Sequence, residues 1–276
     1  PYFKLEKVQK GVFDLATRLY GITFKEVNNI PLYHPEVKTY EVYDNDGSFL
    51  AVLYTDFFPR ESKGGGAWMT QFRGQKMVDG KDQRPLVSLV MNFTKPTDTK
   101  PSLLTFNEVT TFLHEFGHAL HGMFSKCTYG STSMDGVSRD FVELPSQFME
   151  NYALEKEWLD TWAVHYQTGE KIPQEYIDKI KKSSNFQAGY ASDRQLSFGM
   201  VDMAWHTITE PVTEPLVDFE QRAIGKTEIM PVVKGSAFSP AFGHIFAGGY
   251  AAGYYSYKWA EVLDADAFSL FKQKGI

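Results

Sequence analysis

The sequence contains a single cysteine, Cys127, among its 276 residues. One thiol excludes an internal disulfide framework and a zinc site built from several cysteines. Positive charge is also scarce, since 28 lysines and arginines stand against 34 aspartates and glutamates, for a net charge of −6. This balance disfavours binding to nucleic acid and to anionic membrane surfaces. The sequence also lacks an apolar run long enough to cross a bilayer and a recognisable signal peptide.

The remaining composition is that of a globular protein, with 43% hydrophobic and 22% charged residues. Aromatic residues make up 15% of the chain, a high share that predicts a large core and an aromatic-lined cleft. We expect a cytoplasmic location, because cysteine is so rare, with the periplasm as the alternative. The chain begins at Pro1 without a methionine, so we expect a fragment or a processed form, from which a signal peptide could have been removed.

The pattern of apolar residues divides the chain into a strand-bearing first third and a helical remainder. Segments 39–43 and 49–54 flank the turn residues Asp44–Gly47 and predict a hairpin, and 86–93 is a further strand candidate. The glycine-rich segment 63–69 is either a mobile surface loop or a loop that approaches substrate. Helices are expected at 1–28, 106–122, 141–163, 173–208 and 246–273. The expected fold is therefore mainly α with a small β-sheet, in a single domain over 1–276.

The most informative segment is HEFGHALH at 114–121, which contains the spacing His-Glu-x-x-His. On a helix, residues four apart lie about 6 Å apart along the axis on the same face, so His114 and His118 can bind one metal ion. Glu115 projects to one side, where it can reach the attacking water as a general base without binding the metal. The competing interpretation is a chance match on a surface helix. The small residues Gly117 and Ala119 would allow a partner helix to pack closely.

A catalytic zinc ion needs a third protein ligand. Four carboxylates follow the motif closely, and the spacing alone does not choose between Glu143 and Glu150 (the others are Asp135 and Asp140). His121 lies about 10 Å along the helix axis from His114, so we expect it to pack in the core or to form supporting hydrogen bonds.

Three motifs resemble the thimet oligopeptidase family (M3) of zinc metallopeptidases: HEFGHALH at 114–121, RDFVELPSQ at 139–147 and GGYAAGYYSYKW at 248–259. Within that family, the chain is most similar to the bacterial peptidyl-dipeptidase (dipeptidyl carboxypeptidase) branch. The resemblance covers essentially the whole chain, but only the catalytic part of a family member. It implies a zincin-type catalytic domain with the zinc motif on a central helix. It also implies N-terminal and C-terminal helical regions that are missing from this sequence.

The resemblance implies one Zn²⁺ per chain, held by His114, His118 and Glu143, with Glu115 as the catalytic base. Arg139 lies four residues before Glu143, so on a helix it would either orient Glu143, contact substrate or form a surface ion pair.

Three tyrosines near the C-terminus, Tyr250, Tyr254 and Tyr257, are spaced to share one face of a helix, whereas Tyr255 points elsewhere. From the sequence alone, this pattern indicates a buried aromatic stripe. The resemblance instead implies that Tyr254 and Tyr257 donate hydrogen bonds to the developing oxyanion. It also implies an active-site role for His244 and, less strongly, substrate contact by Tyr250.

These observations predict zinc-dependent hydrolysis of short peptides, with release of C-terminal dipeptides if the branch is correct. The alternatives are an endo-acting oligopeptidase of the same family and a non-catalytic zinc-binding module. The latter would require a closed site with four protein ligands. Short peptides are the expected partners, and neither nucleic acid nor membranes are expected.

Overall fold

The computed structural model describes residues 1–275, and these are about half helical with a small mixed sheet. They form two compact units. Unit 1 comprises Pro1–Val137, Leu144–Asp178 and the described residues from Asp264 onward, and unit 2 comprises Ser138–Glu143 and Lys179–Leu263. In the described part of the chain, no helix has the length and apolar character needed to cross a membrane.

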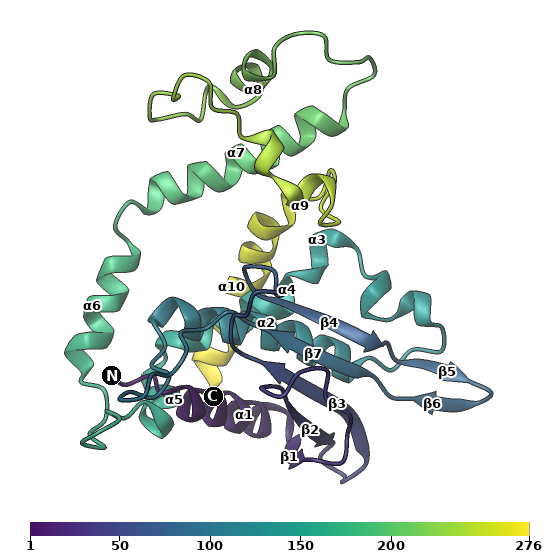
Figure 1. The fold of residues 1–276 in the computed structure, drawn as a ribbon, viewed down its shortest axis with the longest axis vertical. Helices are drawn as coiled ribbons and strands as arrows, with labels where there is room; N and C mark the ends of the chain where they lie inside the picture. The colour runs from purple at the N-terminus through teal and green to yellow at the C-terminus, as the bar shows by residue number, and fades with distance from the viewer. Residues whose placement is uncertain (276) are drawn as a thin grey trace. The chain divides into compact units, whose positions relative to one another are not determined.

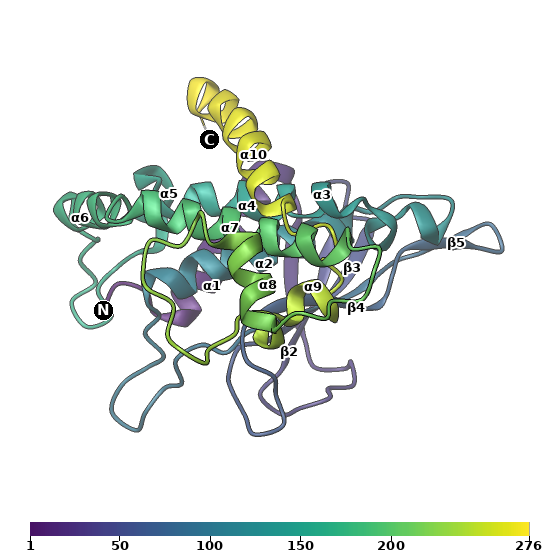
Figure 2. The same cartoon turned by 90° about the horizontal axis from the view of Figure 1, so that it is seen from above.

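Unit 1 contains a five-stranded sheet in which the parallel pair lies at the third and fourth positions. Its order is β1 (Thr23–Val27), β2 (Lys38–Tyr43), β3 (Phe49–Asp56), β7 (Leu86–Val90) and β4 (Trp68–Arg73). Strands β3 and β7 run parallel, and all other neighbours are antiparallel. The predicted hairpin around Asp44–Gly47 is confirmed as the β2–β3 connection. A separate hairpin, β5 (Lys76–Val78) and β6 (Lys81–Gln83), projects beyond the sheet (Figures 1 and 2).

Helix α2 (Phe106–Phe124) packs against this sheet and carries the histidine motif. It begins with a capping box, since the Thr105 side chain accepts the Glu108 backbone N–H and the Glu108 carboxylate accepts the Thr105 N–H. This arrangement satisfies two backbone donors at the helix start. The buried rings of Phe112 and Phe116 lie on α2, and the Phe112 ring meets Phe57 at a centroid distance of 5.2 Å. These contacts fix α2 in the core of unit 1.

The first helix is shorter than expected. Helix α1 (Leu5–Tyr20) ends at Gly21, which adopts a left-handed conformation with φ 76°. Glycine is the usual residue for such a helix end because it has no side chain to clash. The prediction of a helix to residue 28 was therefore wrong, and Thr23–Val27 instead pairs with β2.

The other expected helices exist but are interrupted. Segment 141–163 divides into α3 (Arg139–Val142), α4 (Leu144–Glu150), the 3-10 turn Asn151–Leu154 and α5 (Lys156–Trp162). Segment 173–208 divides into α6 (Gln174–Ser184) and α7 (Ala188–His206), because Gln187 adopts a left-handed conformation between them.

Unit 2 is built around α7, α8 (Leu216–Ile224), α9 (Gly243–Phe246) and the first turns of α10 (Ser256–Lys274). Its core consists of Val201, Ile224, Phe242, Ile245 and Tyr254. The sequence did not predict α8, and the expected helix at 246–273 begins only at Ser256. Residues 247–255 are a series of turns instead.

Candidate metal centre

His114 and His118 lie one turn apart on α2, and both are partly exposed. Their ring centroids are 5.0 Å apart and the ring planes are nearly perpendicular. Residues at this spacing share one face of a helix, so two imidazoles can approach one ion. The helix expected at 106–122 is therefore confirmed as α2, and it carries both histidines.

Glu143 is the residue at which the chain passes from unit 2 into unit 1, one peptide bond before α4. Its side chain is only 1% exposed. One ligand atom each from His114, His118 and Glu143 lies within 4.8 Å of the other two. Two imidazole nitrogens and one carboxylate oxygen are a donor set typical of a catalytic zinc site, so these residues fit the metal that the sequence implies.

Glu150 was the other candidate for the third metal ligand, but its carboxylate contacts a histidine of the motif. Its Oε1 atom lies 2.6 Å from Nδ1 of His114. A carboxylate bonded to Nδ1 fixes the orientation of the imidazole and leaves Nε2 as the ring nitrogen that can bind a metal ion. Nothing in the spacing of the sequence distinguished this supporting role from that of a direct ligand.

The close approach of α4 to α2 depends on Gly117, which lies between the two histidines. A Cβ atom at this position would lie 2.3 Å from the carbonyl oxygen of Pro145 and 2.6 Å from Cα of Ser146. No side chain fits in that space, so the prediction of a closely packed partner helix at Gly117 is confirmed. This packing brings Glu150 of α4 to His114 of α2.

The two other polar residues of the motif are buried to different extents. Glu115 is 7% exposed. His121 is half-buried, and burial, together with the neighbouring His118, lowers its pKa. A neutral imidazole is therefore favoured at His121, consistent with a packing role.

The tyrosines at 250, 254 and 257 do come together, although not as a helical stripe. Tyr250 and Tyr254 precede α10, and only Tyr257 lies on it. The Tyr250 and Tyr257 rings stack at a centroid distance of 5.3 Å, and Tyr254 lies 5.1 Å from Tyr257. The predicted helix was wrong, but a compact turn produces the same cluster. Tyr255 is 47% exposed and donates a hydrogen bond to Asp140, so it faces away from the cluster.

Burial raises the pKa of all three clustered phenols, to about 12 for Tyr254. After burial, the largest cause for Tyr250 and Tyr257 is the negative charge of Glu143, which also receives a hydrogen bond from the Tyr250 hydroxyl. Phenols with raised pKa values stay protonated at neutral pH and can act as hydrogen-bond donors.

Arg139 and His244 border this cluster within unit 2. The Arg139 guanidinium lies 4.7 Å above the centroid of the Tyr250 ring, and its aliphatic part fills the space beside Gly253. Arg139 therefore supports Tyr250 through a cation–π contact. The exposed His244 ring lies 5.7 Å from the Tyr250 ring and 6.2 Å from the Tyr254 ring.

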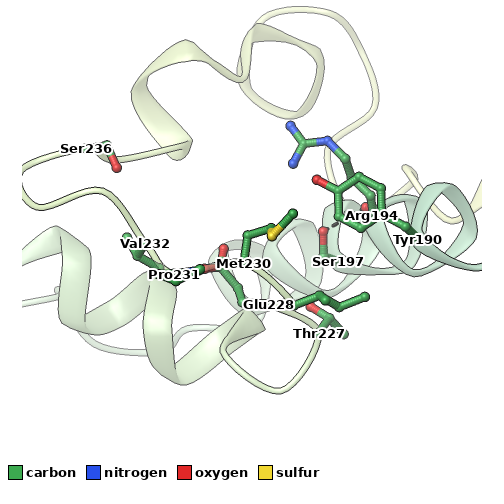
Figure 3. Close-up of a pocket in the computed structure, with 10 residues that line it drawn as sticks. Tyr190, Arg194, Ser197, Thr227, Glu228, Met230, Pro231, Val232 and Ser236 are labelled. Atoms are coloured by element: carbon green, nitrogen blue, oxygen red, sulfur yellow. Dashed lines mark hydrogen bonds between the residues drawn. The ribbon is translucent and has the colours of Figure 1, made fainter. Parts of the chain in front are cut away.

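Unit 2 also contains a cavity of about 200 Å³ between α7 and residues 227–236 (Figure 3). Arg194 and Tyr190 line it from α7, and Met230 lines it from the opposite segment. The Arg194 guanidinium lies 4.8 Å above the Phe198 ring, which in turn meets Tyr254 edge-on.

A helix carrying His-Glu-x-x-His, with a nearby glutamate in a group of residues that could hold a metal ion, is typical of metallopeptidases. The whole chain, residues 1–276, matches the profile of peptidase family M3, and it belongs to this family. It is 44% identical to oligopeptidase A of Escherichia coli and 43% identical to dipeptidyl carboxypeptidase of Salmonella typhimurium. It is 36% identical to a thimet-like oligopeptidase of Dictyostelium discoideum.

All of this chain aligns with each of these relatives, but it spans only 41–42% of their length. Relatives with two different names, oligopeptidase A and dipeptidyl carboxypeptidase, match this chain at almost equal identity. The similarity alone therefore does not choose between the two modes.

Proposed function

We propose that this chain is the catalytic domain of a zinc peptidase of the zincin type, with one Zn²⁺ bound by His114, His118 and Glu143. The proximity of these three side chains carries the proposal, because it pairs a metal-binding donor set with the buried Glu115 of the same motif. The substrates are short peptides. A single catalytic domain and a cytosolic location are parts of the same proposal.

Glu115 acts as the base in this mechanism. Its carboxylate takes a proton from the attacking water and then delivers it to the leaving amine. The position of Glu115 supports this role, since it is 7% exposed and lies on α2 directly after His114. Zinc, when bound, supplies Lewis acidity that polarises the scissile carbonyl.

Tyr254 and Tyr257 donate hydrogen bonds to the oxyanion that develops on the attacked carbonyl. Their raised pKa values support this assignment, because a donor must retain its proton throughout the working pH range. His244 assists at the edge of the same cluster, and Tyr250 contacts substrate.

Release of C-terminal dipeptides requires a cation that binds the terminal carboxylate of the substrate. We assign this role to Arg139. It is exposed, has no carboxylate partner among the described residues and lies against Tyr250. A guanidinium matches a carboxylate through two parallel hydrogen bonds. An endo-acting oligopeptidase remains the alternative and would not need this contact.

The decisive experiment compares Glu115→Gln with Glu108→Gln in the full-length protein. Both change one glutamate of α2 to its amide, but Glu108 belongs to the capping box, which accepts glutamine. We expect Glu115→Gln to retain zinc and to lower kcat by about 10³-fold, because general-base catalysis contributes about 10²–10⁴-fold. Glu108→Gln should keep nearly full activity.

Full turnover by the Glu115→Gln variant would remove Glu115 from the mechanism. If the wild-type protein binds zinc but cleaves no peptide, the non-catalytic zinc-binding module is the correct interpretation instead.

A further inference from the structure

A buried aspartate in unit 2 takes no part in the mechanism described above. Asp202 lies on α7 and is 0% exposed. Its Oδ1 accepts the backbone N–H of Ala252 at 2.9 Å, and its Oδ2 accepts the backbone N–H of Tyr254 at 2.8 Å. One carboxylate thus binds two backbone donors of the turn that carries the tyrosine cluster.

The turn needs this support because its backbone is strained. Ala252 adopts φ 53°, one of three positive values among the non-glycine residues that the structure describes. A left-handed conformation is unfavourable for alanine, whose Cβ atom crowds the following carbonyl. Such a conformation persists only where the surrounding structure holds it in place.

The position of Asp202 also explains how three tyrosines that do not share a helix form one cluster. The two bonds fix the backbone on either side of Gly253, and the ring of Tyr254 packs in the core beside Phe242 and Tyr257. Nδ1 of His206 also lies 2.8 Å from this Oδ1 and 2.8 Å from the backbone carbonyl oxygen of Asp202. A carboxylate anion accepts backbone N–H groups more strongly than a neutral acceptor does.

We propose that Asp202 is the positioning residue of the tyrosine turn: its carboxylate binds the N–H groups of Ala252 and Tyr254 and so holds the Tyr254 phenol in its catalytic place. This inference rests on the proposed function of Tyr254, because it assigns to Asp202 an effect on turnover that Asp202 exerts only through that phenol.

Unit 2 offers a matched control in Glu220. This carboxylate is 7% exposed, lies on α8 and accepts the backbone N–H groups of Phe238 and Ser239 at 2.9 and 2.6 Å. Glu220→Gln therefore removes a buried carboxylate with two backbone bonds from the same unit without touching the tyrosine turn. Asp202→Asn makes the equivalent change at the turn.

The first measurement is amide hydrogen exchange of the segment 247–256 in the full-length protein, followed by mass spectrometry. We expect exchange in Asp202→Asn to be at least about tenfold faster than in the wild type, because one acceptor oxygen becomes a donor. Glu220→Gln should leave this segment unchanged. Unchanged exchange in Asp202→Asn overturns the proposal, whatever the kinetics show.

The second measurement is the kinetics of peptide cleavage. Asp202→Asn should lower kcat by about tenfold or more with little change in KM and zinc content, because it weakens an interaction made in the transition state. Adding Ala252→Gly should restore part of the lost kcat, since glycine adopts positive φ without strain.

The double variant Asp202→Asn/Tyr254→Phe separates this proposal from the function assigned to Tyr254. We expect its kcat to be only slightly lower than that of Tyr254→Phe alone, because both changes act on the same phenol. If the fold-loss of kcat in the double variant equals the product of the two single losses, the proposal is overturned. If Tyr254→Phe retains full turnover, the proposed role of Tyr254 fails, and the exchange measurement still decides whether Asp202 holds the turn.

Discussion

Oε1 of Glu150 lies 2.6 Å from Nδ1 of His114, so a carboxylate on α4 selects the ring nitrogen that His114 can offer to a metal. Both residues belong to unit 1. The relationship means that metal affinity should depend on a residue that does not bind the metal.

Substitution of Glu150 by glutamine tests this relationship. The amide is a weaker partner for the His114 ring, so we expect zinc affinity to fall by about 10–100-fold. Competition with a fluorescent zinc chelator measures the affinity. Glu157→Gln is the control, because Glu157 is an exposed partner of Arg18. Equal zinc affinity in both variants would show that Glu150 does not support the site.

Substitution of Gly117 by alanine should disturb the contact between α2 and α4. The new methyl group would meet backbone atoms of Pro145 and Ser146, which cannot move aside as a flexible side chain can. We expect a loss of about 1–3 kcal/mol in the free energy of unfolding, which is typical of overpacking. Denaturant titration gives this value.

Gly189→Ala is the helical control for that experiment, because a Cβ atom at Gly189 meets nothing within 4 Å. It should be neutral or stabilising by up to about 1 kcal/mol, since alanine favours helices. A Gly117→Ala variant as stable as this control would contradict the close packing.

Removal of the metal should reduce stability as well as activity. A ligand that binds only the folded state stabilises it by about 4 kcal/mol at a concentration 1,000 times its Kd. We therefore expect a chelator to lower Tm by several degrees and to abolish peptide cleavage, and added zinc to restore both. The Glu115→Gln variant should show the same change in Tm, because it retains the ligands. A Tm that does not respond to chelation would argue against a metal site in the folded chain.

Arg139 should decide the mode of cleavage. We expect Arg139→Ala to raise KM by about tenfold or more for a peptide with a free C-terminus, because a charge-assisted bidentate contact is lost. The same peptide with an amidated C-terminus should be a poor substrate for both proteins. Arg222→Ala is the control, since Arg222 also lies over an aromatic ring, that of Phe219, in unit 2. Equal cleavage of the free and amidated peptides by the wild type would favour an endo-acting oligopeptidase.

Tyr254→Phe should lower kcat by about 10²-fold, the loss typical when one oxyanion donor is removed. Tyr255→Phe should leave kcat nearly unchanged, because the Tyr255 hydroxyl is bonded to Asp140 outside the cluster. Since burial raises the pKa of Tyr254 to about 12, activity should not be lost through Tyr254 at any pH below about 10. Comparison of the two variants over this pH range checks both expectations.

The sequence predicted those parts of the site that depend on short-range spacing. The one-turn separation of His114 and His118 follows from helix geometry alone. The end of α1 at Gly21 was missed because the apolar pattern continues beyond it, whereas pairing with β2 decides that Thr23–Val27 is a strand.

Contacts between distant segments could not be predicted from spacing. Glu150 reaches His114 only because α4 packs on Gly117, and Asp202 lies 52 residues from Tyr254 in the sequence. The tyrosine spacing fitted a helix well, but Ala252 and the glycines around it form turns that no 3.6-residue period describes. A tertiary contact overrides local preference in each of these cases.

The bare backbone at Gly117 sets a condition for anyone who wishes to transplant this motif. A host helix given only the two histidines and the glutamate would still need an uncovered patch between them, wide enough for the main chain of another helix to rest on. Without that patch, the carboxylate could not come within hydrogen-bond distance of the first imidazole. The orientation of the transplanted histidine rings would then not be fixed.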